Sequence, residues 1–364
     1  MTVEEPLPRS RHLTVLSAAI PAQQRAWLDL WMRWPEREPA AHPGYLAALA
    51  SPDERPMCAV LDLGDGGIIY PFQMRDIDLA AGLSGGYRDI TGPVFGYTGA
   101  FKWNTGDDIA DTFWSEFAVW ARQERIVSSF VRLSLFEHDL LAFDGRVRVV
   151  QPNVVRDLQH PEDVLWRDMD QKVRKNVRRA RDEGVVIVSD TNWEHLDAFV
   201  QIYLSTMERR NAAPRYRFAL GFFGELLSAV PDSVQLYLAR VGSTFISAEL
   251  ILTSTHHAYS FLGGTLDDAF PLRPNDLLKY EIILALREQG LTDFVLGGGP
   301  QPGDGIFRYK RSFAPGGVVD FKVGEKIFDS EVYGALVRHR AALSETQGSP
   351  WTPSPEFFPA YRAG

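Results

Sequence analysis

A lysine set among aromatic residues near the C-terminal end of this chain is the side chain best suited to catalysis. Lys310 lies in the run Tyr309-Lys-Arg-Ser-Phe313 and is one of seven lysines in the sequence. An ammonium group held beside rings can stabilise the oxyanion that forms when an amine attacks a carbonyl carbon. The competing interpretation is a lysine that lays its stem on apolar neighbours and extends its amine into solvent. We expect Lys310 to be catalytic.

Two carboxylates are candidates for accepting the proton of such an attacking amine. Glu249 lies in the middle of an apolar run at residues 246–252, where burial would raise its pKa toward that of a general base. Asp89 is the second candidate, either as a base or as an anchor for the acceptor amine. Two alternatives stay open: Glu249 can pair with an arginine, or the substrate itself can carry the proton.

Six cationic side chains within ten residues, at positions 172–181, form the densest charge cluster of the chain. On a helix, Arg174, Arg178 and Arg181 share one side. With Lys172 they are our candidates for binding phosphates of a nucleic-acid stem or a nucleotide. The alternative is a solvated helix face balanced by neighbouring acids. Arg209, at the end of a later helix, either extends this patch or complements the dipole of its own helix.

Coenzyme A and metal ions are not expected as cofactors. The segment at residues 263–275 occupies the place of a pyrophosphate-binding loop, but it lacks a Gly-x-Gly core, and Asp267 and Asp268 would repel a phosphate. His256 and His257 are neighbours on a strand and point to opposite faces, so they cannot share a metal. Gly82-Leu-Ser-Gly-Gly86 matches the pattern around a nucleophilic serine, yet Ser84 lacks the strand before it and the helix after it, which indicates a turn.

The length and composition limit the class of protein that has to position these groups. The chain has 364 residues, of which 45% are apolar, and a formal net charge of −9. These values predict two globular domains with substantial cores. The negative net charge argues against nucleic-acid binding driven by the overall charge of the chain. The sequence has no apolar stretch of membrane-spanning length. A single cysteine, Cys58, fits a reducing cytoplasm.

The order of the predicted elements repeats once along the chain. In the first half, helices are expected at 21–34, 42–50 and 107–125, and strands at 57–63, 68–72 and 129–136. In the second half, helices are expected at 193–210, 217–229 and 275–289, and strands at 233–241, 245–253, 258–263, 294–296 and 318–323. Gly290 is expected to end the last of these helices. We therefore predict an α/β (α+β) fold with domains at 1–150 and 151–364, linked near residues 141–155.

Four stretches, taken in this order, resemble the Fem (FemABX-like) family of non-ribosomal aminoacyl and peptidyl transferases. The first, Tyr87-Arg-Asp-Ile-Thr-Gly-Pro-Val-Phe-Gly-Tyr-Thr-Gly99, is similar to a first-domain motif of that family. The others are the basic helix at 172–184, Thr206-Met-Glu-Arg209, and Tyr309-Lys-Arg-Ser-Phe313. The resemblance implies two GNAT-like acyltransferase domains, each a mixed and mostly antiparallel sheet flanked by helices.

The resemblance also implies an activity and a set of substrate contacts. It predicts transfer of an aminoacyl group from aminoacyl-tRNA to an amine of a peptide, a peptidoglycan precursor or a natural product, with the basic helix on the tRNA. The substrate-binding candidates are Tyr97, Tyr259, Tyr309, Phe313 and Arg209. We expect Tyr97 and Tyr259 to line the acceptor site between the two domains.

One departure from the family concerns the acceptor. The stretch at residues 41–49 lacks the lysine that holds a nucleotide diphosphate in the peptidoglycan enzymes, which argues against a UDP-linked acceptor. Two other functions stay open on the same scaffold: an acyl-CoA-dependent N-acyltransferase, and a binding protein without catalysis.

Overall fold

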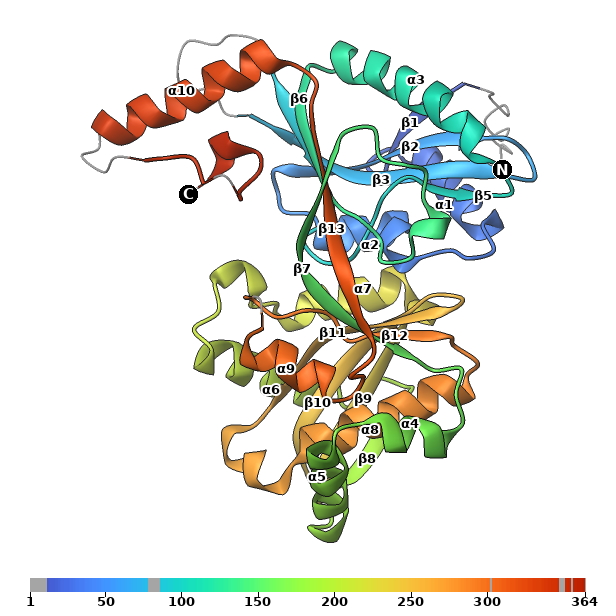
Figure 1. Cartoon of the computed structure of the whole chain (residues 1–364), viewed down its shortest axis with the longest axis vertical. Coiled ribbons are helices and arrows are strands. Elements are labelled where there is room, and N and C mark those ends of the chain that lie inside the picture. The colour runs from blue at the N-terminus through green and yellow to red at the C-terminus, as the bar shows by residue number, and fades with distance from the viewer. Residues whose placement is uncertain (1–11, 78–85, 302, 347–350, 355, 364) are drawn as a thin grey trace. The chain divides into compact units, whose positions relative to one another are not determined.

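The computed structural model describes residues 12–77, 86–301, 303–346, 351–354 and 356–363. The chain forms two compact units (Figure 1): unit 1 contains residues 1–150 and 322–364, and unit 2 contains residues 151–321. The sequence analysis assigns residues 322–364 to the second domain, whereas the structure groups them with residues 1–150. The reason is strand β13 (Val318–Ile327), whose second half pairs with a strand of unit 1.

Unit 1 is built on strands in the order β1-β2-β3-β4-β6-β13, with β5 beside β3. Strands β4 and β6 are parallel, and the other pairs are antiparallel. The bounds are β1 (Thr14–Ser17), β2 (Glu54–Asp62), β3 (Gly67–Asp76), β4 (Arg88–Thr91), β5 (Phe101–Trp103) and β6 (Ile126–Arg132). The helices are α1 (Pro21–Arg33), α2 (Pro43–Leu49), α3 (Ala110–Gln123) and α10 (Ser330–Thr346).

Strand β3 shows why unit 1 has helices on both faces of its sheet. The residues from Gly67 to Met74 are all buried, and successive side chains of a strand point to opposite faces. Tyr70 contacts the rings of α3, with 5.4 Å between its ring centroid and that of Trp114. Gln73 points the other way and donates a hydrogen bond to the carbonyl oxygen of Leu46 in α2, at 2.8 Å. Alternate residues of one strand therefore pack against different helices.

Unit 2 is built on strands in the order β7-β12-β11-β10-β9-β8. Strands β11 and β12 are parallel, and the other pairs are antiparallel. The bounds are β7 (Arg146–Asp157), β8 (Val186–Asp190), β9 (Val234–Val241), β10 (Thr244–Thr253), β11 (His257–Thr265) and β12 (Asp293–Val295). The helices are α4 (Glu162–Asp168), α5 (Gln171–Asp182), α6 (Leu196–Arg209), α7 (Leu220–Ala229), α8 (Pro274–Glu288) and α9 (Gly305–Arg311).

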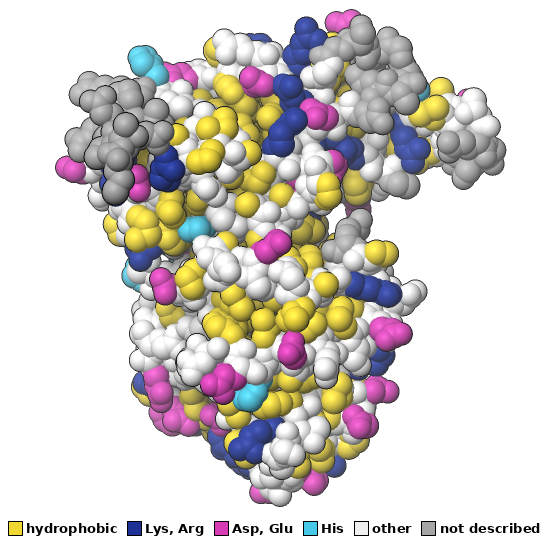
Figure 2. Space-filling view, turned by 180° about the vertical axis from the view of Figure 1, so that it is seen from behind, with side chains coloured by type: hydrophobic (Ala, Val, Ile, Leu, Met, Phe, Trp, Pro, Cys, Tyr) yellow, Lys and Arg dark blue, Asp and Glu magenta, His cyan; other side chains and the backbone are white. Residues whose placement is uncertain are grey.

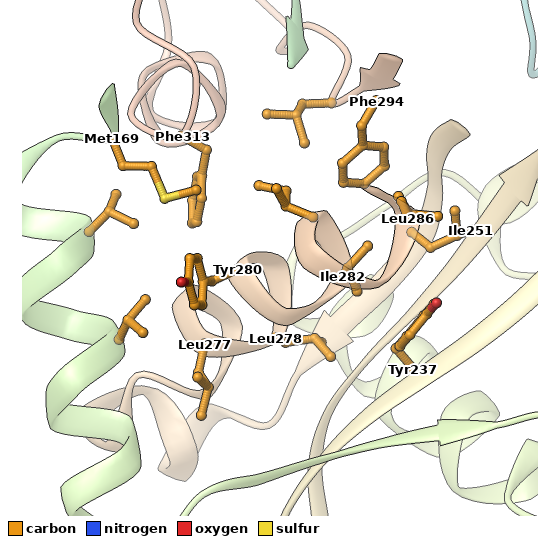
Figure 3. Close-up of a cluster of buried hydrophobic side chains, with 14 of the residues drawn as sticks. Met169, Tyr237, Ile251, Leu277, Leu278, Tyr280, Ile282, Leu286, Phe294 and Phe313 are labelled. Atoms are coloured by element: carbon orange, nitrogen blue, oxygen red, sulfur yellow. The ribbon is translucent and has the colours of Figure 1, made fainter. Parts of the chain in front are cut away.

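Helix α8 forms the centre of the core of unit 2. Proline at its first position fixes a helical φ where no N–H is needed, and Gly290, with φ of 83°, follows its end as predicted. Figure 3 shows its apolar side chains between the strands and the neighbouring helices, where Leu278 and Ile282 are fully buried. The helix therefore has a fixed place over the sheet, and so do the polar side chains it carries.

The two units repeat one topology, as the sequence predicts. Strands β2, β3 and β4 are followed by α3 and the parallel strand β6, and strands β9, β10 and β11 are followed by α8 and the parallel strand β12. The predicted fold class, with mixed and mostly antiparallel sheets flanked by helices, is confirmed. The segment expected to be a link, at 141–155, instead contributes most of the long strand β7. The two units exchange their last strands. Strand β7, which follows β6 of unit 1 in the sequence, pairs with β12 of unit 2, and strand β13, which follows β12 in the sequence, pairs with β6 of unit 1.

Candidate functional site

Lys310 is held in unit 2 by α9, a short helix after the glycine-rich loop that follows β12. Asp304 caps the N-terminus of this helix, where its carboxylate accepts hydrogen bonds from the backbone N–H groups of Phe307 (2.8 Å) and Gln301 (3.1 Å). Phe307 and Phe313 are buried in the core of unit 2. The cap and the two rings together fix the position of the lysine between them.

The ammonium group of Lys310 is only partly exposed to solvent. It donates a hydrogen bond to the carbonyl oxygen of Gly298, 2.8 Å away. Burial, assisted by the charge of Lys279, lowers the pKa of Lys310 from 10.5 to about 8, and the charge of Glu249 opposes this shift. At neutral pH the group is therefore still a cation with hydrogens left to donate.

Gly298 has to be a glycine because the chain passes close to strand β7 at this point. A Cβ atom there would lie 2.9 Å from Oδ1 of Asn153 and 3.0 Å from the carbonyl oxygen of Pro152. A glycine-rich loop at residues 297–305 is typical of a close approach of the backbone to a substrate, and that role stays a prediction. What the structure shows is an approach to the protein itself, which places the carbonyl group that Lys310 contacts.

A buried ion pair lies close enough to act on Lys310. Glu249 in β10 and Lys279 in α8 are only 5% and 4% exposed, and their charged groups are in direct contact. Ser260 in β11 donates a hydrogen bond to the same carboxylate and accepts one from Lys279 at 3.1 Å. Such a pair is tolerated in a core only when both charges are matched and hydrogen-bonded. Lys279 thus occupies the place that the sequence analysis left open for an arginine.

A pocket of about 530 Å³ opens in unit 2, a volume typical of small-molecule sites, and Lys310, Lys279 and Glu249 are not among the residues that line it. Tyr309 lines it, and the hydroxyl group of this residue donates a hydrogen bond to the carbonyl oxygen of Asn275 at 3.1 Å. Burial raises the pKa of Tyr309 well above its usual range. The other lining residues are Arg210, Phe270, Arg273, Pro274, Asn275, Asp276, Pro300, Asp304, Gly305 and Ile306.

The walls of the pocket carry charges of both signs. Arg273 adopts a left-handed backbone conformation, with φ of 59°, immediately before α8. Among the described residues, its Nε atom is buried and has no hydrogen-bond acceptor. Asp276, in the first turn of α8, is 8% exposed and accepts a hydrogen bond from Nδ2 of Asn176 at 3.1 Å. Burial raises the pKa of Asp276.

The basic side chains of α5 contact other parts of unit 2. Arg174 donates hydrogen bonds to carbonyl oxygens at the end of α4, including that of Arg167 at 2.8 Å. The guanidinium of Arg178 lies 5.3 Å from the ring centroid of Trp166, and Arg181 pairs with Glu281 at 2.8 Å. Phosphate binding by these arginines stays a prediction. Lys172, the fourth member of the predicted set, is exposed.

The remaining substrate-binding candidates are placed as follows. Arg209 donates a hydrogen bond to the carbonyl oxygen of Thr265 at 2.9 Å, and its guanidinium lies 4.9 Å from the ring centroid of Phe270 in the pocket wall. Tyr259 belongs to β11 of unit 2 and Tyr97 to unit 1, and both are half-buried. Their role in binding the acceptor stays a prediction. The Ser84 motif lies outside the described residues.

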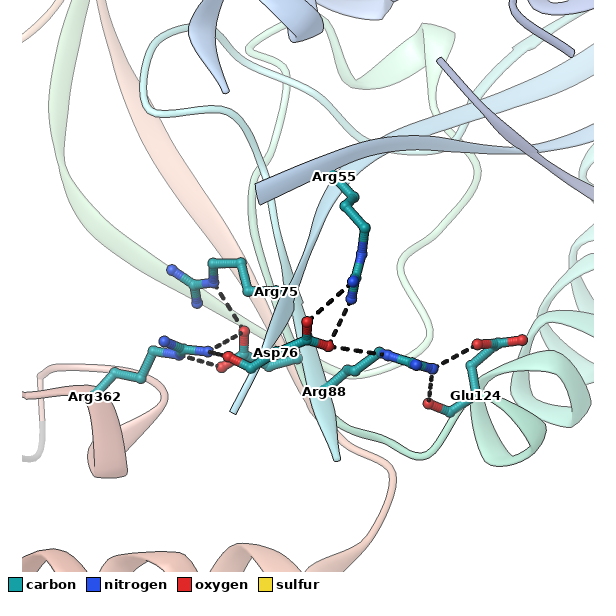
Figure 4. A network of polar contacts seen from close by, with 7 residues as sticks. Arg55, Arg75, Asp76, Arg88, Glu124 and Arg362 are labelled. Atoms are coloured by element: carbon teal, nitrogen blue, oxygen red, sulfur yellow. Dashed lines mark hydrogen bonds and ion pairs between the residues drawn. The ribbon is translucent and has the colours of Figure 1, made fainter. Parts of the chain in front are cut away.

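Asp89 is in unit 1, fully buried in β4. Its carboxylate accepts hydrogen bonds from Nε of Arg75 at 2.8 Å, from the hydroxyl group of Tyr361 at 3.0 Å and from Arg362 at 2.5 Å. Figure 4 shows Arg75, from β3, and Arg362, from the C-terminal segment, within this network. Two guanidinium groups and a hydroxyl group engage this one carboxylate, so the geometry favours a structural ion network over a general base. The catalytic role of Asp89 stays a prediction.

Sequence reasoning missed three residues of unit 2 that lie at or beside this pocket. Lys279 stands in Asn275-Asp-Leu-Leu-Lys-Tyr280, where its neighbours predict a buried helix face, and a lysine in such a face needs a partner. Arg273 and Asp276 flank the start of the same helix. A charge at a position that the apolar pattern assigns to the core is the feature that could have identified Lys279.

A metal site and a membrane-spanning helix each impose requirements on the described residues. Within the part of the chain that the structure describes, no group of three His, Cys, Asp or Glu side chains is arranged to hold a metal. The described helices include none with the length and apolar character that crossing a membrane requires. On the face shown in Figure 2, lysine and arginine side chains are interspersed with aspartate and glutamate.

Comparison with known proteins identifies the fold. Residues 167–311 match the family model of the acetyltransferase (GNAT) domain. The crystal structure of FemX has a TM-score of 0.64, with 12% identity over 86% of this chain and 98% of that one. L-PGS from Bacillus licheniformis has a TM-score of 0.53, with 16% identity over 89% of this chain and 97% of that one. No curated protein matches the sequence.

These matches confirm, at the level of fold, the resemblance that the four sequence stretches indicate. The GNAT match covers α5, the strands β8 to β12, and α8 and α9, and therefore includes both Lys279 and Lys310. The chain has the fold of GNAT-type acyltransferases, arranged as two GNAT-like units.

Proposed function

We propose that this chain is an aminoacyltransferase. It moves an aminoacyl group from aminoacyl-tRNA to an amine of a peptide, a peptidoglycan precursor or a natural product, and forms an amide bond. The observation that carries the proposal is the half-buried ammonium group of Lys310, fixed by Gly298 and lying next to the Glu249–Lys279 pair in a GNAT-type fold.

The reaction requires a charge to be stabilised as it develops. The nitrogen of the acceptor amine attacks the ester carbonyl carbon, and the electron pair of the C=O bond moves to its oxygen. Lys310 keeps one hydrogen on Gly298 and donates another to this oxyanion. The oxyanion then collapses, the bond to the ribose oxygen of the tRNA terminus breaks, and that oxygen takes up a proton to become a hydroxyl group. Lys310 thus acts as a fixed cation that needs no reorientation.

The proton of the attacking amine takes a route that does not depend on a free carboxylate in unit 2. Glu249 is engaged by Lys279 and Ser260, so we assign it a positioning role, in which its charge keeps Lys310 protonated. The amine proton then passes to the leaving oxygen through the substrate, directly or by way of water. In this mechanism Lys310 is the protein group that stabilises the oxyanion, and the substrates themselves transfer the proton.

An acyl-CoA donor is the second candidate, and the match of residues 167–311 to the acetyltransferase domain favours it. The start of α8 argues against it. Pro274 has no N–H to offer a pyrophosphate, and the carboxylate of Asp276 would repel one. We therefore give priority to the aminoacyl donor.

The test supplies the full chain with each donor class separately. Bacterial tRNA charged with a mixture of labelled amino acids is compared with acetyl-CoA and longer acyl-CoA thioesters, in the presence of peptide amines and glycinamide, and amide products are detected by mass spectrometry. Transfer from charged tRNA alone supports the proposal, and transfer from thioesters alone overturns it in favour of the alternative. Absence of transfer from both donors overturns the assignment to either class.

Lys310→Ala then tests the mechanism. Loss of one oxyanion donor is expected to lower kcat by about 10²–10³-fold. Lys322→Ala is the matched control, because Lys322 pairs with an exposed glutamate in unit 1, and it should retain full activity. Unchanged turnover in Lys310→Ala would show that Lys310 is not the catalytic cation.

A further inference from the structure

The pocket at the start of α8 is lined by acidic as well as basic side chains, whereas a site that binds only an anion would need the basic ones alone. Its lining contains the cations Arg210 and Arg273, but also the carboxylates of Asp276 and Asp304. Asp304 is occupied as the cap of α9, whereas Asp276 is not needed as an N-cap, since Arg273 holds that position in α8. A charged group that lines a pocket without serving its own helix cap is a candidate for ligand recognition.

The surroundings of Asp276 leave its charge incompletely matched. The carboxylate is 8% exposed and accepts a hydrogen bond from Nδ2 of Asn176 at 3.1 Å. Two oxygens offer about four acceptor positions, so the carboxylate has acceptor capacity left over. Arg273 and Lys172 act on it only through space. Burial raises its pKa despite these cations.

We propose that Asp276 binds the α-ammonium group of the transferred residue, so that the pocket selects α-aminoacyl donors over simple acyl donors. This inference rests on the proposed function and adds the substrate class of the same site. An aminoacyl ester carries a primary ammonium one carbon away from the reacting carbonyl, whereas an acetyl or fatty acyl group has none. A buried carboxylate discriminates between the two because an uncharged group would leave it unpaired.

The other charges of the pocket fit the rest of such a donor. Arg210 and Arg273 both line the pocket, and guanidinium groups suit the phosphates of a nucleotide terminus. The buried Nε atom of Arg273, which has no acceptor among the described residues, has donor capacity to spare. The volume of about 530 Å³ exceeds what one amino acid fills and leaves room for an attached nucleoside. The pocket therefore matches an ammonium at Asp276 and an anion on the arginine side.

The first experiment measures binding and does not require turnover. L-alaninamide, L-serinamide, L-leucinamide and L-lysinamide are titrated into the full chain at pH 7, each beside its N-acetylated form, and binding is followed by NMR or calorimetry. At least one free amide should bind at least tenfold more tightly than its N-acetyl form. Asp276→Asn should remove this preference, and Asp268→Asn, an exposed acid outside the pocket, should keep it.

The outcomes separate this inference from the proposed function. If no free amide binds better than its N-acetyl form to the unaltered chain, the inference is overturned, whatever the variants do. In the transfer assay, equal use of aminoacyl-tRNA and N-acetylaminoacyl-tRNA overturns the inference while leaving aminoacyl transfer intact. A preference for free amides in a chain that transfers nothing supports the pocket assignment and overturns the proposed function.

Discussion

The two units have the same topology, but the middle strands of their sheets carry different kinds of side chain. In unit 1 the middle strand β3 points Tyr70 and Phe72 at α3, and their ring centroids lie 5.3 and 5.9 Å from that of Phe117. In unit 2 the corresponding strand β10 points Glu249 at Lys279 of α8. One centre is thus filled by rings, and the other contains a matched pair of charges.

Unit 1 has its own buried charge, but its placement differs. Asp89 is held by Arg75, Arg362 and Tyr361, and the last two come from the C-terminal segment. This network ties the end of the chain to strand β4. The comparison teaches that burial of a charge does not by itself identify an active site: in unit 2 the charges act on a second lysine, whereas in unit 1 they attach the C-terminal segment to the sheet.

The largest expected effect comes from breaking the pair in unit 2. Lys279→Met leaves the carboxylate of Glu249 buried without its counter-charge, and we expect the free energy of unfolding to fall by about 3–5 kcal/mol. The double variant Glu249→Leu with Lys279→Met should recover most of this loss, because two apolar groups can replace a buried pair. Denaturant unfolding of the two variants measures both values. A single variant as stable as the parent chain would contradict the assignment.

The corresponding change in unit 1 should affect stability without affecting chemistry. Asp89→Asn removes the charge that Arg75 and Arg362 share, and because both arginines are partly solvated, a smaller loss of about 2 kcal/mol is expected. Transfer activity per folded molecule should stay unchanged. Activity that falls at least tenfold while the protein remains folded would instead support the catalytic role predicted for Asp89 from the sequence.

The pH dependence of activity should report on unit 2. Because the pKa of Lys310 is lowered to about 8, the protonated catalyst is lost as the pH rises through 8, and kcat should fall about tenfold per pH unit above it. Folding favours the neutral form of this group, so its contribution to stability rises with pH between about 8 and 10.5.

Glu249→Gln sharpens the same measurement. The charge of Glu249 raises the pKa of Lys310, so the variant should move the falling limb of the profile to lower pH. A limb that does not move would show that Glu249 has no electrostatic influence on the catalytic group.

The smallest expected effect concerns the basic helix α5. Arg178 lies over the ring of Trp166, so Arg178→Ala should lower the free energy of unfolding by about 0.5–1 kcal/mol. Filter binding with tRNA, measured beside Lys172→Ala, tests whether the helix also contacts phosphate. A loss of affinity confined to Lys172→Ala would assign the arginines to packing, and a loss in both variants would support the predicted patch.

The sequence predicts those features of the fold that depend on local pattern. The helix expected at 21–34, the strands expected at 57–63 and 68–72, and the helix end at Gly290 all correspond to elements that the structure contains. Strand β7 escapes this reasoning because Val149 and Val150 are adjacent and Pro152 follows them, which breaks the alternation of apolar and polar residues. Its position in unit 2 depends on pairing with β12, which no local pattern encodes.

The candidate site was predictable only in its individual groups. Lys310 and Glu249 stand out by type and neighbourhood, but the partner of Glu249 lies 30 residues away on another element. Similarly, helical spacing places Arg174, Arg178 and Arg181 together, yet it does not show that their guanidinium groups meet α4 and α8. Tertiary contacts decide whether a charge is available to a ligand, and a single sequence does not contain them.

The exchange of last strands between the units has a consequence for synthesis on the ribosome. Unit 2 is one continuous stretch and can close once its own residues have emerged. Unit 1 is translated first, but its sheet lacks the edge at β6 until the segment that contains β13 has left the exit tunnel. The earlier-made half is therefore the later to mature, and its unfinished β6 edge stays open to chaperones or to mispairing while the other half is being translated.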